Sequence, residues 1–296
     1  MMSMSMKDLA RAALAAARRV RIKAQARTEL PVCIFDLIEE NYRDELDLRF
    51  KAAPSLEGLY VKGDPAAGEP AVAVISSLRP SGRQRLTAAH ELGHHEFGHG
   101  DSIDEVRESG ESGDFEPKEF IATQFAAYLL MPKLGVLKAF VDRGIDVRNA
   151  TPEQILAVSS QFGVGYATLI KHLCYALKEM SKLHATALTK ISPKKLREDL
   201  LGYTATGELL LVDPHWAGRA IDLAVGDHVI VPTGTKVDGA AVKRISSRLL
   251  GDVYQGQTPG RARVENSGLG LASYIRICRA GYQGCSMFRH LEDDDE

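Results

Sequence analysis

The sequence predicts an α+β protein in two parts. An apolar run at residues 71–75 has strand character and precedes two segments with helical character, at 83–97 and 117–132. From about Leu183 the texture changes, and strand-like runs follow that are separated by Gly- and Pro-containing turns. We therefore expect a first domain over residues 1–184, with helical extensions, and a smaller C-terminal α/β domain over residues 185–296.

Composition limits the class of protein. A chain of 296 residues with 45% hydrophobic residues is long enough for two domains with sizeable cores. A formal net charge of −2 argues against a general nucleic-acid coat protein. The cysteines are sparse and form no C-x-x-C pair, which argues against a cysteine-based zinc knuckle and fits a reducing cytoplasm. Cys278 and Cys285 are either a redox pair or inert thiols.

The most informative motif is His90-Glu91-Leu92-Gly93-His94. On a helix, positions i and i+4 lie about 40° apart, so both imidazoles can reach one ion at the roughly 2.0–2.1 Å of a Zn–N bond. Glu91 lies about 100° round from His90, where a carboxylate can face a metal-bound water without binding the metal. This is the pattern of a metallopeptidase with Glu91 as general base.

The surroundings of the motif support this interpretation. Residues 79–82 break the preceding strand, and Gly98 ends the helix that carries the motif. A zinc-binding helix directly after a strand is what a gluzincin-like peptidase domain requires. The alternative is an ordinary surface helix that happens to carry several histidines.

A zinc site of this kind needs a third protein ligand and an open position for water. His99 is a poor candidate because it lies about 140° from His94 round the helix, beyond the glycine that ends it. We expect it at the surface or in support of a ligand. The metzincin pattern would need Gly at 97 and His at 100, where this chain has Phe97 and Gly100.

Glu119 is the better third ligand. It lies in the first turn of an apolar helix that Pro117 opens and Pro132 closes, and a carboxylate is favoured at that end of a helix. Two imidazoles and one carboxylate would leave a Zn²⁺ site with a net charge near +1. The alternatives are Glu116 as the ligand, or a first-turn acidic residue that binds no metal.

Two separated motifs resemble one family. They are the run 83–94 and, downstream, Glu119-x-x-Ala122-x-x-Phe125-Ala126-Ala127-x-Leu129-Leu130-Met131-Pro132, and together they look like the ImmA/IrrE metallopeptidases. The resemblance covers roughly residues 56–180. It implies that His90, His94 and Glu119 bind the metal and that Glu91 is the base. The family usually has Asn or Asp where this chain has Thr123, a position that would orient a metal-bound histidine.

The resemblance also implies a biological role. Such proteins commonly cleave one partner, a small helix-turn-helix repressor, and so release a mobile element, a DNA-damage response or an anti-phage operon. The implied cofactor is Zn²⁺, with Mn²⁺ as a substitute in vitro. Tyr128, Tyr166 and His172 are open candidates for the oxyanion stabiliser. The alternative function is a metal-binding regulator that controls the repressor or binds DNA without hydrolysis.

The remaining segments carry weaker expectations. The basic stretch 7–27 is not a convincing signal peptide, and we expect a helix packed on the catalytic domain rather than one that binds nucleic acid. No membrane helix is expected, because no run of 18 apolar residues occurs. The acidic stretch 101–117 reads as a loop beside the cleft or a solvated linker, and 292–296 as an acidic tail.

Helices are predicted at 152–162 and from about 166 through 180, joined by a glycine turn, as a helix-turn-helix-like pair. DNA reading by this pair is a minor hypothesis. Strands are predicted at 208–212 and 227–231, and further ones at 261–264 and 274–277. Some members of the family that the chain resembles have a sensory domain at this end, so the resemblance implies that this C-terminal region senses a ligand or a partner.

Overall fold

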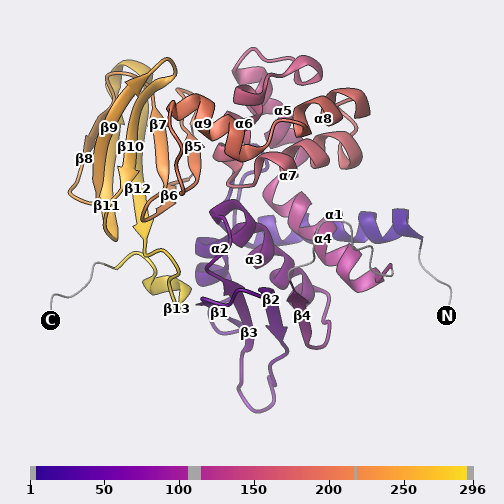
Figure 1. The fold of residues 1–296 in the computed structure, drawn as a ribbon. Helices are drawn as coiled ribbons and strands as arrows, with labels where there is room; N and C mark the ends of the chain where they lie inside the picture. Colours follow the sequence, from indigo (N-terminus) through magenta and orange to yellow (C-terminus); the bar gives the residue numbers. More distant parts are fainter. Residues whose placement is uncertain (1–4, 106–114, 217–218, 292–296) are drawn as a thin grey trace, which may run out of the picture. The chain divides into compact units, whose positions relative to one another are not determined.

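The structure is a computed structural model that describes residues 5–105, 115–216 and 219–291 (Figure 1). The chain forms two compact units. The first unit comprises residues 1–28, 32–132 and 281–288, and the second comprises residues 29–31, 133–280 and 289–296. The predicted α+β class is confirmed.

The first unit contains a five-stranded mixed sheet. Its strands are β1 (Leu46–Lys51), β2 (Leu56–Val61), β3 (Ala71–Ser76), β4 (Ser102–Glu105) and β13 (Gly284–Cys285), in the spatial order β13-β1-β3-β2-β4. β1 and β3 are parallel, and the other pairs are antiparallel. The apolar, β-branched run 71–75 forms β3, as predicted, and β3 lies at the centre of the sheet. β4 forms one edge.

The helices of the first unit are α1 (Met6–Lys23), α2 (Ile34–Asn41), α3 (Ser81–Glu96) and α4 (Pro117–Leu130). α3 follows β3 after a short turn and ends before Gly98, whose φ of 61° is in the left-handed region. α1 packs against α4, and the buried Arg21 donates from Nη1 to the Leu129 carbonyl at 2.7 Å. The expectation that the N-terminal helix packs on the catalytic domain is therefore confirmed.

The two helices that carry the motifs approach each other closely. A Cβ added at Gly93 would lie 3.0 Å from Cδ1 of Phe125 and 3.1 Å from the Cα of Ala122. A side chain at this position would require its neighbours to shift by a few tenths of an ångström. The small residues therefore bring the histidines of α3 within reach of the first turn of α4.

The second unit begins with helices. They are α5 (Lys133–Asp142), a 3-10 turn η1 (Val147–Asn149), α6 (Pro152–Phe162), α7 (Tyr166–Lys171), a π-helical turn η2 (His172–Ala176), α8 (Lys182–Thr189) and α9 (Pro193–Leu201). α6 has the predicted bounds. Thr151 and Gln154 form a capping box at its start, and Gly163 ends it with φ 65°. The helix expected through residue 180 ends at the π turn instead, because Lys178 has a left-handed φ of 59°.

Two four-stranded sheets complete the second unit. One has the order β5 (Leu209–Leu211), β7 (His228–Val231), β10 (Gly251–Gly256), β9 (Val242–Arg248). The other has the order β6 (Ile221–Ala224), β12 (Leu271–Cys278), β11 (Gly260–Asn266), β8 (Lys236–Asp238), and a 3-10 turn η3 (Ser267–Leu269) precedes β12. Apolar residues of both sheets, such as Val229, Tyr254, Val264 and Ile275, share one core cluster. The two sheets therefore pack together as layers.

The expected α/β architecture of the C-terminal region, residues 185–296, is not confirmed. In the described chain after α9 there are strands and 3-10 turns, including η4 (Ser286–Phe288), but no α-helix. The reason is the length of the connections. A crossover helix needs a connection of a dozen or more residues, and the connections between consecutive strands here are shorter. The four strands predicted there correspond to β5, β7, β11 and β12.

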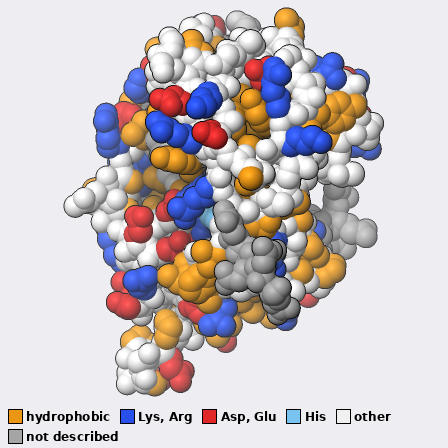
Figure 2. All heavy atoms as spheres, turned by 90° about the vertical axis from the view of Figure 1, so that its left-hand side faces the viewer, with side chains coloured by type: hydrophobic (Ala, Val, Ile, Leu, Met, Phe, Trp, Pro, Cys, Tyr) orange, Lys and Arg blue, Asp and Glu red, His pale blue; other side chains and the backbone are white. Residues whose placement is uncertain are grey.

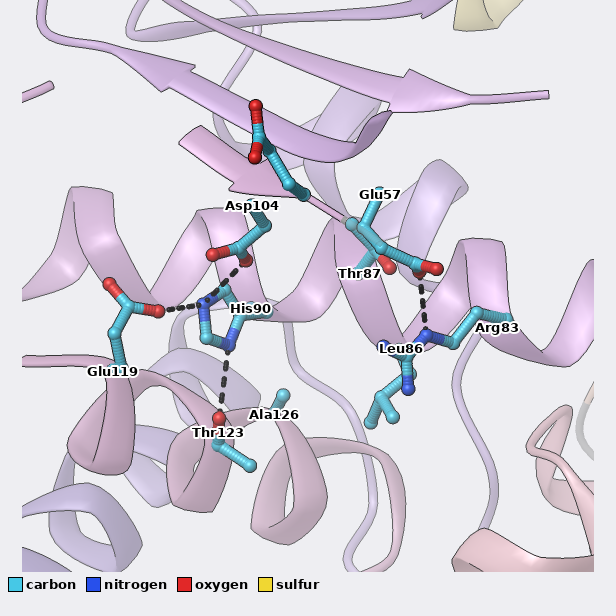
Figure 3. A pocket seen from close by; sticks show the side chains of 10 residues that line it. Glu57, Arg83, Leu86, Thr87, His90, Asp104, Glu119, Thr123 and Ala126 are labelled. Atoms are coloured by element: carbon cyan, nitrogen blue, oxygen red, sulfur yellow. Dashed lines mark hydrogen bonds and ion pairs between the residues drawn. The ribbon is translucent and has the colours of Figure 1, made fainter. Parts of the chain in front are cut away.

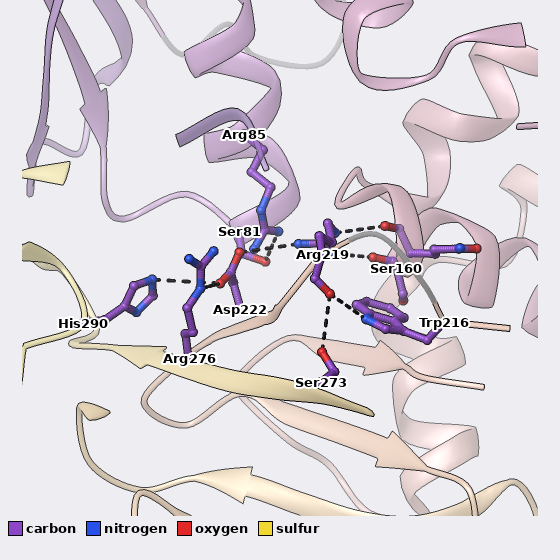
Figure 4. A network of polar contacts seen from close by, with 10 residues as sticks. Ser81, Arg85, Ser160, Trp216, Arg219, Asp222, Ser273, Arg276 and His290 are labelled. Atoms are coloured by element: carbon purple, nitrogen blue, oxygen red, sulfur yellow. Dashed lines mark hydrogen bonds and ion pairs between the residues drawn. The ribbon is translucent and has the colours of Figure 1, made fainter. Parts of the chain in front are cut away.

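The compact units also divide at a different place from the expected boundary at 184/185. The division falls at 132/133, so α5 to α9 belong with the two sheets. Ala157 of α6 and Leu201 of α9 share a core cluster with Leu211 and Ile230. A buried polar network reinforces this packing (Figure 4): Arg219 donates to the carbonyl of Ser160 at 2.7 Å and pairs with Asp222 at 3.4 Å.

Two surface properties bear on partners. On the face in Figure 2, basic and acidic side chains are interspersed rather than gathered into one basic area. By length and composition, the stretch Pro117–Asp142 is apolar enough to cross a membrane, although half of its most apolar window is buried in the structure. That burial, and the core positions of Phe125 and Leu129 in α4, fit a core helix of a soluble domain.

Candidate metal centre

Three donor groups converge between α3 and α4. His90, His94 and Glu119 each offer one ligand atom, and these atoms lie within 4.8 Å of one another. Nε2 of His90 is 3.0 Å from Nε2 of His94 and 3.1 Å from Oε2 of Glu119, and Nε2 of His94 is 3.4 Å from Oε1 of Glu119. Ligands about 2.1 Å from a tetrahedral zinc ion are about 3.4 Å apart. The donor set and its spacing therefore fit a metal ion.

The other nitrogen of each imidazole has its own partner. Nδ1 of His90 is 3.3 Å from Oγ1 of Thr123 (Figure 3), and Nδ1 of His94 is 3.0 Å from Nδ1 of His99. Both rings thus turn Nε2 toward the cluster, as orienting partners of metal-bound histidines do. Thr123 lies where an orienting residue was expected, and His99 supports a ligand histidine rather than joining the cluster.

Glu91 is fully buried beside the cluster. In the described chain its two carboxylate oxygens have no hydrogen-bond partner. Its neighbour on β2 is Gly58, where an added Cβ would lie only 2.0 Å from Oε1 of Glu91. The absence of a side chain at Gly58 therefore makes the space that this carboxylate occupies. A buried carboxylate without a partner is costly unless a cation or a water completes it.

A pocket of about 320 Å³ opens beside the cluster, with His90 and Glu119 in its lining (Figure 3). Its lining residues come from α3, α4 and the β2–β4 edge of the sheet: Glu57, Arg83, Leu86, Thr87, His90, Asp104, Glu105, Glu119, Thr123 and Ala126. Its volume is at the lower end of the range for ligand pockets. The metal cluster thus forms part of the wall of an accessible cavity.

Asp104 on β4 faces the same nitrogen as Glu119. Its Oδ2 is 3.1 Å from Nε2 of His90, although Asp104 is not one of the three clustered donors. Deeper in the sheet, Glu57 accepts from Nε of Arg83 at 2.7 Å and pairs with Arg79 at 3.4 Å. The pocket therefore holds several carboxylates, of which Glu57 is already neutralised.

The ionisable groups are tightly coupled. Burial lowers the pKa of His90, but its contacts with Asp104 and Glu119 outweigh burial and raise that pKa to about 10. Burial raises the pKa of Glu91 to about 8, against the opposing effect of His90. Hydrogen bonds with His90 and His94 hold the pKa of Glu119 below its usual value. The negative charge of these carboxylates therefore favours a positive charge at the cluster. Either a metal ion or a proton on His90 can supply that charge.

The comparison with protein families agrees with this geometry. Residues 47–173 match the family model of peptidase M78, described as an IrrE N-terminal-like domain. The match supports an ImmA/IrrE family metallopeptidase domain over residues 47–173. The match covers β1 to α7 and includes all three clustered donors. No curated protein matches the chain.

The ImmA/IrrE region contains further residues that the sequence singled out. Glu116 is at the N-cap of α4 and remains outside the donor cluster. Tyr128 is on α4 but is not among the described residues that line the pocket. Tyr166 and His172 belong to the second unit, and the hydroxyl of Tyr166 donates to the Leu188 carbonyl at 3.1 Å. The oxyanion role of these residues stays a prediction.

Sequence reasoning missed three residues at the site. Asp104 was part of a stretch interpreted as an acidic loop, although Ser102–Glu105 forms the edge strand β4. Glu57 and Gly58 are on β2, which was not predicted. Four residues that alternate between partly buried and exposed give only a weak strand pattern. The rest of the expected loop, residues 106–114, lies outside the described residues, as does the acidic tail 292–296.

Proposed function

We propose that this protein is a zinc-dependent endopeptidase that cleaves a helix-turn-helix transcriptional repressor at one site and so releases the operon that the repressor controls. The observation that carries the proposal is the buried, unpartnered carboxylate of Glu91 beside the His90, His94 and Glu119 cluster. A purely structural metal site has no use for such a group. The family, a metallopeptidase family, supports hydrolysis.

The donor set supports zinc in particular. Two imidazoles and one carboxylate are a usual zinc set in hydrolases and leave a position for solvent. When bound, zinc would lower the pKa of a coordinated water to roughly 7 and polarise the scissile carbonyl. Mn²⁺ can occupy similar ligands in vitro.

The chain's own residues would supply the proton transfers. A carboxylate oxygen of Glu91 would accept a proton from the attacking water and return it to the leaving nitrogen. Thr123 and His99 would hold the ligand imidazoles in orientation through Nδ1. Gly58 and the surrounding sheet would keep Glu91 away from bulk water, so the carboxylate stays basic.

The choice of substrate rests on the ImmA/IrrE resemblance. The pocket beside the cluster can admit an extended peptide or a loop, but not a folded domain. This supports a protein substrate with one accessible segment rather than general digestion. A cytoplasmic regulatory peptidase that acts on one repressor fits such a restricted site.

The decisive experiment incubates the purified protein, with Zn²⁺ or Mn²⁺, with the helix-turn-helix protein encoded by the neighbouring reading frame. We expect two discrete fragments, identified by mass spectrometry. A repressor that stays intact with both metals contradicts the proposal.

The variant Glu91→Gln should retain the metal and lose cleavage by at least about 10²-fold, because the amide cannot accept the proton. Metal content, measured on the same sample, is the control for folding of the site. If Glu91→Gln cleaves at the parent rate, the base is another group. If it releases the repressor from DNA without cleaving it, the non-hydrolytic regulator is the better interpretation.

A further inference from the structure

The pocket beside the metal cluster carries an excess of negative charge. Glu57, Asp104, Glu105 and Glu119 line it, and Arg83 is the basic residue among its described lining. Glu119 belongs to the proposed metal-binding cluster. Glu57 forms ion pairs with Arg83 and Arg79. These two carboxylates and the arginine therefore cannot decide which side chain of a substrate enters.

Asp104 is different, because metal binding would remove its partner. In the structure its Oδ2 is 3.1 Å from Nε2 of His90. Nε2 is the nitrogen that faces the metal cluster, since Nδ1 of His90 is engaged by Thr123. A metal-bound imidazole nitrogen carries no proton and cannot donate to Asp104.

The position of Asp104 makes it accessible to a ligand. It is on β4, at the edge of the sheet, and about a quarter (28%) of its side chain is exposed. Its strand neighbour Glu105 also lines the pocket and is exposed. A carboxylate without a hydrogen-bond donor in such a cavity binds a cationic donor more strongly than a neutral one, because the hydrogen bond is charge-assisted.

We propose that Asp104, assisted by Glu105, is a specificity residue that binds a lysine or arginine side chain of the peptide substrate beside the scissile bond. The inference rests on the proposed peptidase function and names the class of residue that this site selects. A DNA-binding repressor offers many such side chains, because it must neutralise phosphates.

Binding without turnover tests the inference. The zinc-loaded Glu91→Gln protein is titrated into fluorescein-labelled, alanine-rich peptides that carry one lysine at a scanned position, and into matched peptides with glutamine or glutamate there. Fluorescence anisotropy gives the affinities. We expect the lysine peptide to bind about fivefold more tightly than the glutamine peptide at one position, and the glutamate peptide to bind most weakly. The preference should shrink at high salt.

The substitution Asp104→Asn, added to Glu91→Gln, should abolish the preference for lysine and leave the affinity for the glutamine peptide unchanged. Glu40→Gln is the matched control, because it makes the same charge change on an exposed residue of α2 outside the pocket. Equal affinity for the three peptides, no binding of any, or a lysine preference that survives Asp104→Asn overturns the inference.

Metal content separates specificity from metal binding. The Asp104→Asn protein should hold as much zinc as the parent, measured by mass spectrometry of the purified protein. Loss of zinc would make Asp104 a ligand and overturn its role in specificity. A protein that prefers the lysine peptide but cleaves no repressor would contradict the proposed function and leave this inference standing.

Discussion

At the scale of single residues, the site depends on what holds the two histidines as much as on the histidines themselves. The family usually has an Asn or Asp where Thr123 stands, and the threonine hydroxyl still reaches Nδ1 of His90 at 3.3 Å. His94 is held by another histidine, His99. When Nε2 of His94 binds a metal, its Nδ1 carries the proton, so Nδ1 of His99 must accept. Burial and the nearby His94 lower the pKa of His99 to about 4, which keeps it neutral and able to accept.

We therefore expect His99→Ala to weaken zinc binding by about 10- to 100-fold, because His94 loses the group that orients it. Competition with a chromophoric chelator measures this affinity. His215→Ala is the control, since His215 is an exposed histidine of the second unit. Parental zinc affinity in His99→Ala would show that α3 alone orients His94.

At the scale of elements, the edge of the sheet shapes the pocket. The pairing of β2 with β4 shifts register, so that Leu56 is opposite Glu105 while Gly58 is opposite Asp104. Glu57 is the extra residue of this bulge and lines the pocket. Bulges often re-aim side chains beside active sites. This irregular pairing brings a carboxylate and a glycine to the site from adjacent positions.

Gly58→Ala should lower cleavage by about 10²-fold while zinc stays bound, because the new Cβ displaces the Glu91 carboxylate and a shift of about 1 Å is enough for such a loss. Single-turnover cleavage and metal content are measured together. Gly100→Ala is the matched control, since a Cβ there meets nothing within 4 Å. Unchanged cleavage in Gly58→Ala would mean that Glu91 does not need its observed position.

At the scale of the whole molecule, the chain leaves the first unit and comes back to it. Residues 133–280 build the second unit, and residues 281–288 then add β13 and η4 to the first. β13 pairs antiparallel with β1, and the ring of Tyr282 lies edge-on to Phe50 at 6.1 Å. The returning segment thereby covers a sheet edge that would otherwise be open to association.

Replacing Tyr282 by Ala should lower the free energy of unfolding by about 1–2 kcal/mol, because the ring contact with Phe50 and the hydrogen bond to the Cys285 carbonyl are both lost. Thermal and urea unfolding measure the effect. Phe288→Ala, in the same segment but half exposed, should cost less than about 0.5 kcal/mol. Equal free energies of unfolding for the two variants would mean that the contacts of Tyr282 do not stabilise the packing of this segment on the sheet.

The helices that carry the motifs could be predicted from the sequence, because their signals are local. The prolines around α4 and the i, i+4 histidines of α3 depend only on neighbours along the chain. Glu119 could be proposed as the third ligand because it lies in the first turn of a helix that Pro117 opens, and because the family resemblance implies it. The helix α6 was likewise predicted to its bounds, since its capping residues are adjacent in sequence.

How distant segments meet depends on the tertiary structure. Asp104 and Gly58 reach the site through strand pairing, and β13 reaches the sheet through a return across half of the chain. The sequences of the C-terminal strands do not indicate which sheet each joins, so their packing in two layers could not be predicted. The physical reason is the same in each case: hydrogen-bond partners and burial in a sheet are set by residues far away in sequence, and local propensity cannot specify them.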